Sequence, residues 1–98
     1  MGKTYLHPLV VLKTLNREHE QVRIGIIAGR GIGKAVVRNR IKRLLRACMQ
    51  DLHPEITPGN DLLLLARQSI TQAKYSQVQV ALKDLLEQAQ ILKLPDAT

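Results

Sequence analysis

Hydrophobic and polar positions along the chain predict three strands. Leu9–Leu12 and Val22–Ala28 are short apolar runs, the second rich in β-branched residues, and both favour extended structure. The polar stretch Lys13–Gln21 between them can join the two strands as a hairpin. Leu62–Leu65 is a continuous apolar run without polar alternation, which indicates a strand buried on both faces.

Two longer segments have the apolar spacing of helices that cover a core. The first extends from about Lys34 to Leu52, and the second from about Tyr75 to Leu92, with Pro95 beyond its end. The predicted order is therefore β-β-α-β-α, an α+β two-layer sandwich with the helices on one face of a small sheet. The strand–helix–strand succession suggests a βαβ unit, for which a right-handed crossover is the default.

Length and composition limit the classes of protein. The chain has 98 residues, so we take residues 1–98 as a single domain. One cysteine, Cys48, cannot form an internal disulfide, and three scattered histidines predict no metal site. There is no apolar run long enough for a membrane span and no signal-type N-terminus. These features favour a cytoplasmic protein without a membrane partner, and they say nothing of its oligomeric state.

Positive charge is concentrated in one segment of the chain. The sequence holds 15 Lys and Arg against 8 Asp and Glu, a formal net charge of +7. Seven of the basic residues lie between Arg30 and Arg46, a window without any acid, and the basic residues outside it balance the acids. A local excess of this kind is typical of a surface that binds a polyanion, most often nucleic acid.

The basic residues of this window fall mainly on the polar side of the predicted helix, with Arg40 nearest the core boundary. Arginine forks bind phosphate oxygens in pairs and lysine adds point charge, which suits a folded RNA backbone. Asn39 can both donate and accept, so it can read a 2′-hydroxyl or a base edge. The predicted RNA-binding residues are Arg30, Lys34, Arg38, Asn39, Arg40, Lys42, Arg43 and Arg46.

A solvated charged face and a membrane-surface helix both account less well for this basic segment. A solvated face usually carries both signs of charge, whereas this window has no acid. A membrane-surface helix would carry Trp or Phe at its boundary, and the chain has neither.

Gly29, Gly31 and Gly33 precede the helix in the setting of a phosphate-binding loop. Their spacing does not complete a dinucleotide fingerprint, and Ala35 stands where a P-loop needs a hydroxyl. Two interpretations stay open: a phosphate resting on the glycine amides and the helix N-terminus, or plain turn geometry. No nucleophile–base pair is evident and Cys48 lies on the apolar stripe, so we predict no catalytic residues and a buried structural thiol.

The basic segment resembles a known signature. Ala35–Arg46, which contains Arg38-Asn39-Arg40, is similar to the Arg-Asn-Arg motif of the bacterial ribonuclease P protein subunit, and Arg23–Gly25 and Pro58–Asp61 also match that family. The resemblance implies a fold like domain 2 of ribosomal protein S5, with a left-handed βαβ crossover. It further implies that the protein binds the catalytic RNA of ribonuclease P and assists removal of the 5′ leader from precursor tRNA. In that family the RNA carries out the chemistry with its own Mg²⁺, and the protein holds no cofactor.

This chain departs from the family pattern in three places. Gly29-Arg30-Gly31 replaces a usual Ser-Lys-Lys, and Ala47 replaces a common acid. The usual N-terminal helix and first strand are expected to be missing, because the chain reaches Leu9 after only a few residues. The family uses aromatic side chains in the cleft for the leader, so Tyr5 is a candidate for leader stacking, with a frayed terminal aromatic as the alternative.

Two further functions fit less of the sequence. A non-catalytic structural RNA-binding protein, for example a ribosome-associated one, could use the same basic helix. A DNA-binding helical module is disfavoured by the predicted strand Leu62–Leu65.

Overall fold

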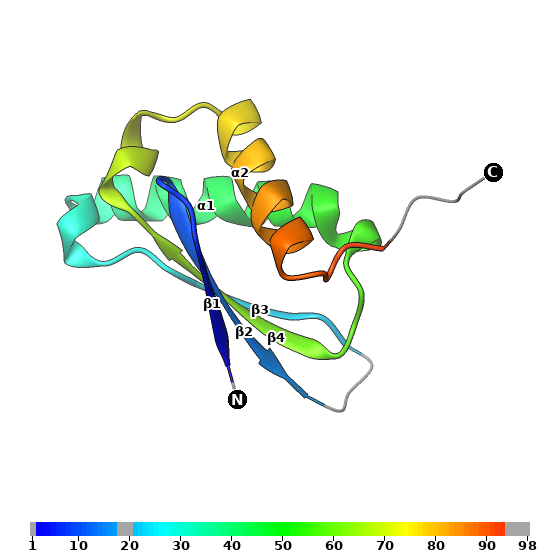
Figure 1. The fold of residues 1–98 in the computed structure, drawn as a ribbon. Coiled ribbons are helices and arrows are strands. Elements are labelled where there is room, and N and C mark those ends of the chain that lie inside the picture. Colours follow the sequence, from blue (N-terminus) through cyan, green and yellow to red (C-terminus); the bar gives the residue numbers. More distant parts are fainter. Residues whose placement is uncertain (1, 18–20, 94–98) are drawn as a thin grey trace.

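The computed structural model describes residues 2–17 and 21–93. Four strands lie in this part of the chain: β1 (Lys3–Leu6), β2 (Val10–Asn16), β3 (Arg23–Ile27) and β4 (Asn60–Ala66). The two α-helices are α1 (Ala35–Leu52) and α2 (Tyr75–Gln88), and three short 3₁₀ helices link the larger elements. These are η1 (Arg30–Ile32), η2 (His53–Glu55) and η3 (Gln68–Gln72). Both α-helices lie on the same side of the sheet, so the predicted two-layer α+β sandwich is confirmed (Figure 1).

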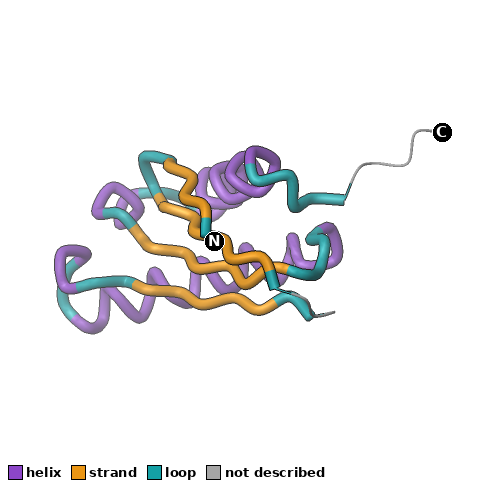
Figure 2. Tube along the Cα trace, turned by 60° about the horizontal axis from the view of Figure 1, so that its bottom comes forward, coloured by secondary structure: helices purple, strands orange, loops and turns teal. Residues whose placement is uncertain are grey.

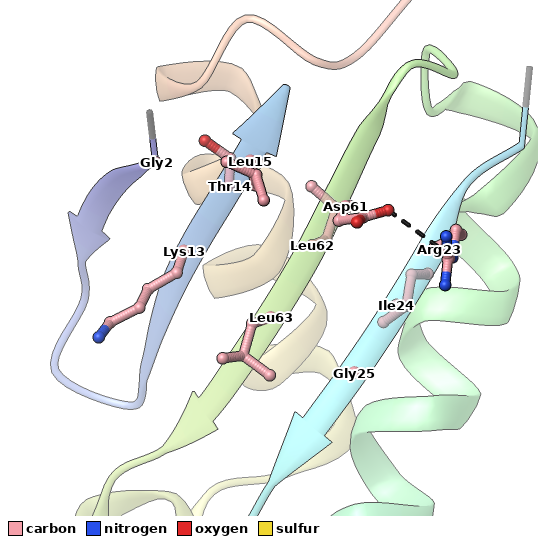
Figure 3. A pocket seen from close by; sticks show the side chains of 10 residues that line it. All are labelled: Gly2, Lys13, Thr14, Leu15, Arg23, Ile24, Gly25, Asp61, Leu62 and Leu63. Atoms are coloured by element: carbon pink, nitrogen blue, oxygen red, sulfur yellow. Dashed lines mark ion pairs between the residues drawn. The ribbon is translucent and has the colours of Figure 1, made fainter. Parts of the chain in front are cut away.

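The strands form one mixed sheet in the order β1-β2-β4-β3. β2 pairs antiparallel with both β1 and β4, whereas β3 pairs parallel with β4. The prediction of a hairpin through Lys13–Gln21 is therefore wrong, because β4 lies between β2 and β3. The unit β3–α1–β4 crosses over with the left-handed sense that the family resemblance implies, against the usual preference (Figure 3).

The expectation that the first strand is missing is also wrong. Lys3–Leu6 forms β1, and Tyr5 is the register partner of Leu12 in β2. The strand was not predicted because it has only four residues, of which Tyr5 alone is even half-buried, so no hydrophobic alternation marks it. The observed order is thus β-β-β-α-β-α, and no helix precedes β1 in the described residues.

The core lies between the helices and one face of the sheet. Leu45 of α1 and Leu82 of α2 are fully buried, as are Val10 and Leu12 of β2. The other face carries no helix or strand from the described residues (Figure 2). For that reason β4 is not buried on both faces as predicted: residues 62 and 64 are buried, whereas 63 and 65 are half-buried.

α2 ends four residues before the predicted Leu92. Gln90 takes a left-handed conformation (φ 58°), its N–H donates to the carbonyl of Glu87, and the N–H of Ile91 donates to the carbonyl of Leu86. This arrangement is a Schellman motif. It reverses the chain so that Ile91 enters the core and Leu92 bridges Ile56.

Candidate nucleic-acid interface

The segment before α1 is a tight turn that leads into the helix. The N–H of Ile32 donates to the carbonyl of Gly29 and the N–H of Gly33 to that of Arg30, at 3.0 and 3.2 Å. Gly33 has a φ of 144°, which disfavours a side chain, so turn geometry accounts for this glycine. Lys34 is the N-cap of α1 but makes no side-chain capping bond, and the first turn has no acid. The positive end of the helix dipole therefore adds to the potential around Arg30 and Lys34.

The basic residues of α1 occupy two rows of the helix surface. Arg38, Lys42 and Arg46 are spaced by four and form one row on the side of α1 that faces β3. Asn39 and Arg43 lie further round the helix and are exposed. Arg30 and Lys34, also exposed, extend this basic face at the N-terminal end of α1.

Arg38 and Arg40 differ from their predicted positions. Arg38 is the half-buried one, and its Nε is shielded from solvent without a hydrogen-bond partner among residues 2–17 and 21–93. Arg40 is exposed, and its Nη2 donates to the carbonyl oxygen of Thr71 at 3.2 Å. The difference arises because α1 turns its buried stripe (Ile41, Leu45 and Met49) partly toward β3, which brings position 38 to the core boundary.

The basic face has no counter-charge of its own. In the described part of the chain, none of the six Lys and Arg side chains of this face, nor Arg40, forms an ion pair with a carboxylate; Asp61 pairs instead with Arg17 (Nε–Oδ2, 3.0 Å) and Arg23 (Nε–Oδ1, 3.8 Å). Like charges four residues apart repel one another, so the face is stabilised when an anion covers it.

The uncovered face of the sheet is a second surface, which the sequence did not predict. Leu6, Val11, Leu65 and Ile27 are register partners and form an apolar row across all four strands. Leu6 and Ile27, at the two ends of the row, are 65% and 46% exposed. A groove of about 520 Å³ continues from this row to the Asp61–Arg23 pair (Figure 3). Its residues could have been found only from the strand register, because they come from segments far apart in the sequence.

Tyr5 lies on the other side of the sheet from this groove. It is half-buried in β1 and packs against the edge of the core, on the face that carries the helices. The alternative of a frayed terminal aromatic is therefore wrong. Leader stacking on Tyr5 stays a prediction, and the ring has only part of its surface free for it.

The remaining candidate chemistries find no geometric support. Cys48 is buried, its thiol lies 3.8 Å from the carbonyl oxygen of Tyr75, and burial together with the nearby Asp51 raises its pKa to about 11. Such a thiol is structural, as predicted. Residues 2–17 and 21–93 contain no group of three or more His, Cys, Asp or Glu arranged to hold a metal ion. None of their helices is long and apolar enough to cross a bilayer.

Comparison with known proteins places this geometry in a family. The family model described as Ribonuclease P matches residues 2–90. The ribonuclease P protein component of Herpetosiphon aurantiacus is 38% identical over 90 residues, which are 92% of this chain and 73% of the relative. That of Geobacillus kaustophilus is 43% identical over 84 residues, 85% of this chain and 69% of the relative. The chain belongs to the ribonuclease P protein family.

Solved structures of the ribonuclease P family have the same fold. The 2.0 Å structure of the Staphylococcus aureus RNase P protein superposes with a TM-score of 0.83 at 29% identity, over 94% of this chain and 84% of that one. The Thermotoga maritima RNase P protein gives a TM-score of 0.82 at 25% identity, over 89% and 83% of the two chains.

The ribonuclease P motifs on either side of α1 meet in this fold. Arg23 and Asp61, from two separate motifs, are direct register partners on β3 and β4. A Cβ on Gly25 would lie 3.1 Å from Cδ1 of Leu63, so glycine lets that side chain lie across β3. The two motifs therefore shape one end of the uncovered sheet face.

Proposed function

We infer that this chain is the protein subunit of a bacterial-type ribonuclease P, which binds the catalytic RNA and assists removal of the 5′ leader from precursor tRNA. The observation that carries the assignment of the RNA-binding surface is the basic face of α1, whose six Lys and Arg side chains have no carboxylate partner in the described residues. Family membership supports the role of the whole protein.

The chemistry of the side chains indicates which roles belong to the protein and which to the RNA. Arginine and lysine side chains screen phosphate repulsion when the catalytic RNA folds, and Asn39 can hydrogen-bond a 2′-hydroxyl or base edge. We propose that hydrolysis of the phosphodiester belongs to the RNA and its Mg²⁺. The described part of this chain offers no carboxylate cluster that fits a resident Mg²⁺. The protein then acts by binding and orienting RNA, not by donating a catalytic group.

The first test is the dependence of RNA binding on salt. Arg43 and Arg46 are exposed, so the double variant Arg43→Ala/Arg46→Ala should fold normally. Each phosphate contact releases counterions when the complex forms, so a variant that lacks two contacts releases fewer of them. The slope of log K against log[salt] should therefore become shallower by about 1.5–2. Binding to ribonuclease P RNA is measured by filter retention at several salt concentrations.

A matched control removes the same charge elsewhere. Lys3→Ala/Lys83→Ala changes two exposed lysines, one on β1 and one on α2, and should leave the slope nearly unaltered. An equal change of slope in both variants would mean that net charge, and not the face of α1, determines binding.

Reconstitution tests the function itself. The chain is added to a bacterial ribonuclease P RNA at low Mg²⁺, and cleavage of precursor tRNA is followed. We expect faster cleavage with the wild-type chain and a smaller gain with Arg43→Ala/Arg46→Ala. The absence of any gain with the wild-type chain would remove the proposed function.

A further inference from the structure

A groove between α1 and β3 lies directly beside the basic row of α1. It has a volume of about 400 Å³ and is lined by Ile24–Ile26, Arg46, Met49, Gln50 and His53. β3 is an edge strand of the sheet and α1 runs alongside it (Figure 3). Its size falls within the usual range of small-ligand sites.

The groove has an apolar floor and a polar rim. Ile24 and Ile26 are half-buried on β3, and Met49 is buried on α1. Gln50 and His53 are exposed at the rim, and neither side chain makes a hydrogen bond within residues 2–17 and 21–93. The amide and the imidazole therefore have donors and acceptors available to a ligand.

The edge of β3 adds backbone groups to this rim. An edge strand leaves every other N–H and C=O without a partner in the sheet. β3 is such an edge strand, and its residues Ile24–Ile26 line the groove. Gln50 continues the basic row of α1, since it follows Arg46 by four residues.

We propose that this groove binds one unpaired nucleotide of the ribonuclease P RNA, with its base on the apolar floor and its phosphate against Arg46. Unpaired bases are recognised by apolar contact with one face and hydrogen bonds to their edges, which this floor and rim supply. Arg46 and the absence of any acid among the lining residues favour an anionic ligand over a cationic one, and the apolar floor adds a surface that suits a base. The proposal rests on the proposed function and adds a base-binding subsite whose lining residues other than Arg46 lie outside the predicted set.

Rim residues other than Lys and Arg allow a test that separates this subsite from the basic face. The double variant Gln50→Ala/His53→Ala leaves every Lys and Arg in place, and both residues are exposed, so the fold should persist. We expect affinity for ribonuclease P RNA to fall by about tenfold, the effect of one or two hydrogen bonds, with an unchanged salt slope. Gln88→Ala, which removes an exposed amide on α2, is the matched control and should bind like wild type.

Site-directed crosslinking identifies what occupies the groove. The native Cys48 is buried with a pKa raised to about 11, so a cysteine introduced by Gln50→Cys is the one that reacts with a photoactivatable reagent. We expect crosslinks to a single unpaired nucleotide of the catalytic RNA, and none there from Glu87→Cys on α2.

Three outcomes would overturn the proposal. One is wild-type affinity in Gln50→Ala/His53→Ala; another is crosslinks spread over base-paired RNA; the third is crosslinks confined to precursor tRNA. Failure of the proposed function is a separate result, because the wild-type chain would then not bind ribonuclease P RNA at all.

Discussion

Arg38 lies both at the boundary of the core and on the basic face. Its side chain is half-buried, and the shielded Nε has no hydrogen-bond partner in the described residues. Long cationic side chains of this kind contribute packing through their stems and charge through their ends. The charge pattern of the sequence predicts that Arg38 is freely exposed. Its contribution to packing is evident only in the tertiary structure.

Replacement of Arg38 separates these two contributions. Arg38→Ala should lower the free energy of unfolding by about 1–2 kcal/mol, because the stem no longer packs. Arg38→Met keeps most of the stem and removes the buried donor, so its stability should stay within about 0.5 kcal/mol of wild type. Both variants should bind RNA more weakly. Urea unfolding measures the stabilities, and equal loss in the two variants would contradict a role for stem packing.

Cys48 makes stability depend on alkaline pH. Burial, assisted by Asp51, raises the pKa of the folded thiol from 9.0 to about 11. Below pH 9 the thiol is neutral in both states, whereas between pH 9 and 11 it ionises first in the unfolded chain, so the folded state loses stability there. Between pH 7 and pH 10.5, wild type should therefore lose about 2 kcal/mol more than Cys48→Ala. Parallel pH profiles from urea unfolding of the two proteins would contradict this.

At the scale of elements, helical periodicity located α1 well and the end of α2 poorly. The predicted start and end of the first helix, about Lys34 and Leu52, agree with Ala35–Leu52 because a glycine turn precedes it and η2 follows it. α2 stops at Gln88 although its apolar spacing continues, since Ile91 must turn back into the core. Apolar periodicity indicates which residues are buried, but it does not show whether a single continuous helix carries all of them to the core.

The turn after α2 gives a stability prediction. Gln90 occupies the left-handed position of the Schellman motif, where a residue with a Cβ is strained. Gln90→Gly should raise the free energy of unfolding by about 0.5–1 kcal/mol. Gln88→Gly lies within the last helical turn and should lower it by up to about 1 kcal/mol. Thermal unfolding of both variants is the measurement, and a loss of stability in Gln90→Gly would show that the strain is absent.

At the scale of the whole molecule, the sheet order determines which strands are held most firmly. β4 pairs with a strand on each side and buries residues 62 and 64, whereas β1 pairs only with β2 and has mostly exposed side chains. Local opening should therefore begin at β1. In native-state hydrogen exchange we expect the slowest amides in β4 and the fastest strand amides in β1. Equal protection of β1 and β4 would indicate that the sheet opens as one unit.

The sequence by itself determined the composition of the basic helix, the two-layer class of the fold and the family, because apolar spacing, charge and a contiguous motif are local properties. Tertiary structure decided the rest. Strand order, the left-handed crossover and the existence of β1 depend on pairing between distant segments, whose energy no local pattern records. The same pairing left one face of the sheet uncovered and set Arg46, Gln50 and His53 beside the edge of β3. In the tertiary structure the charged segment Arg30–Arg46 forms a basic row that includes the half-buried Arg38 and borders a groove.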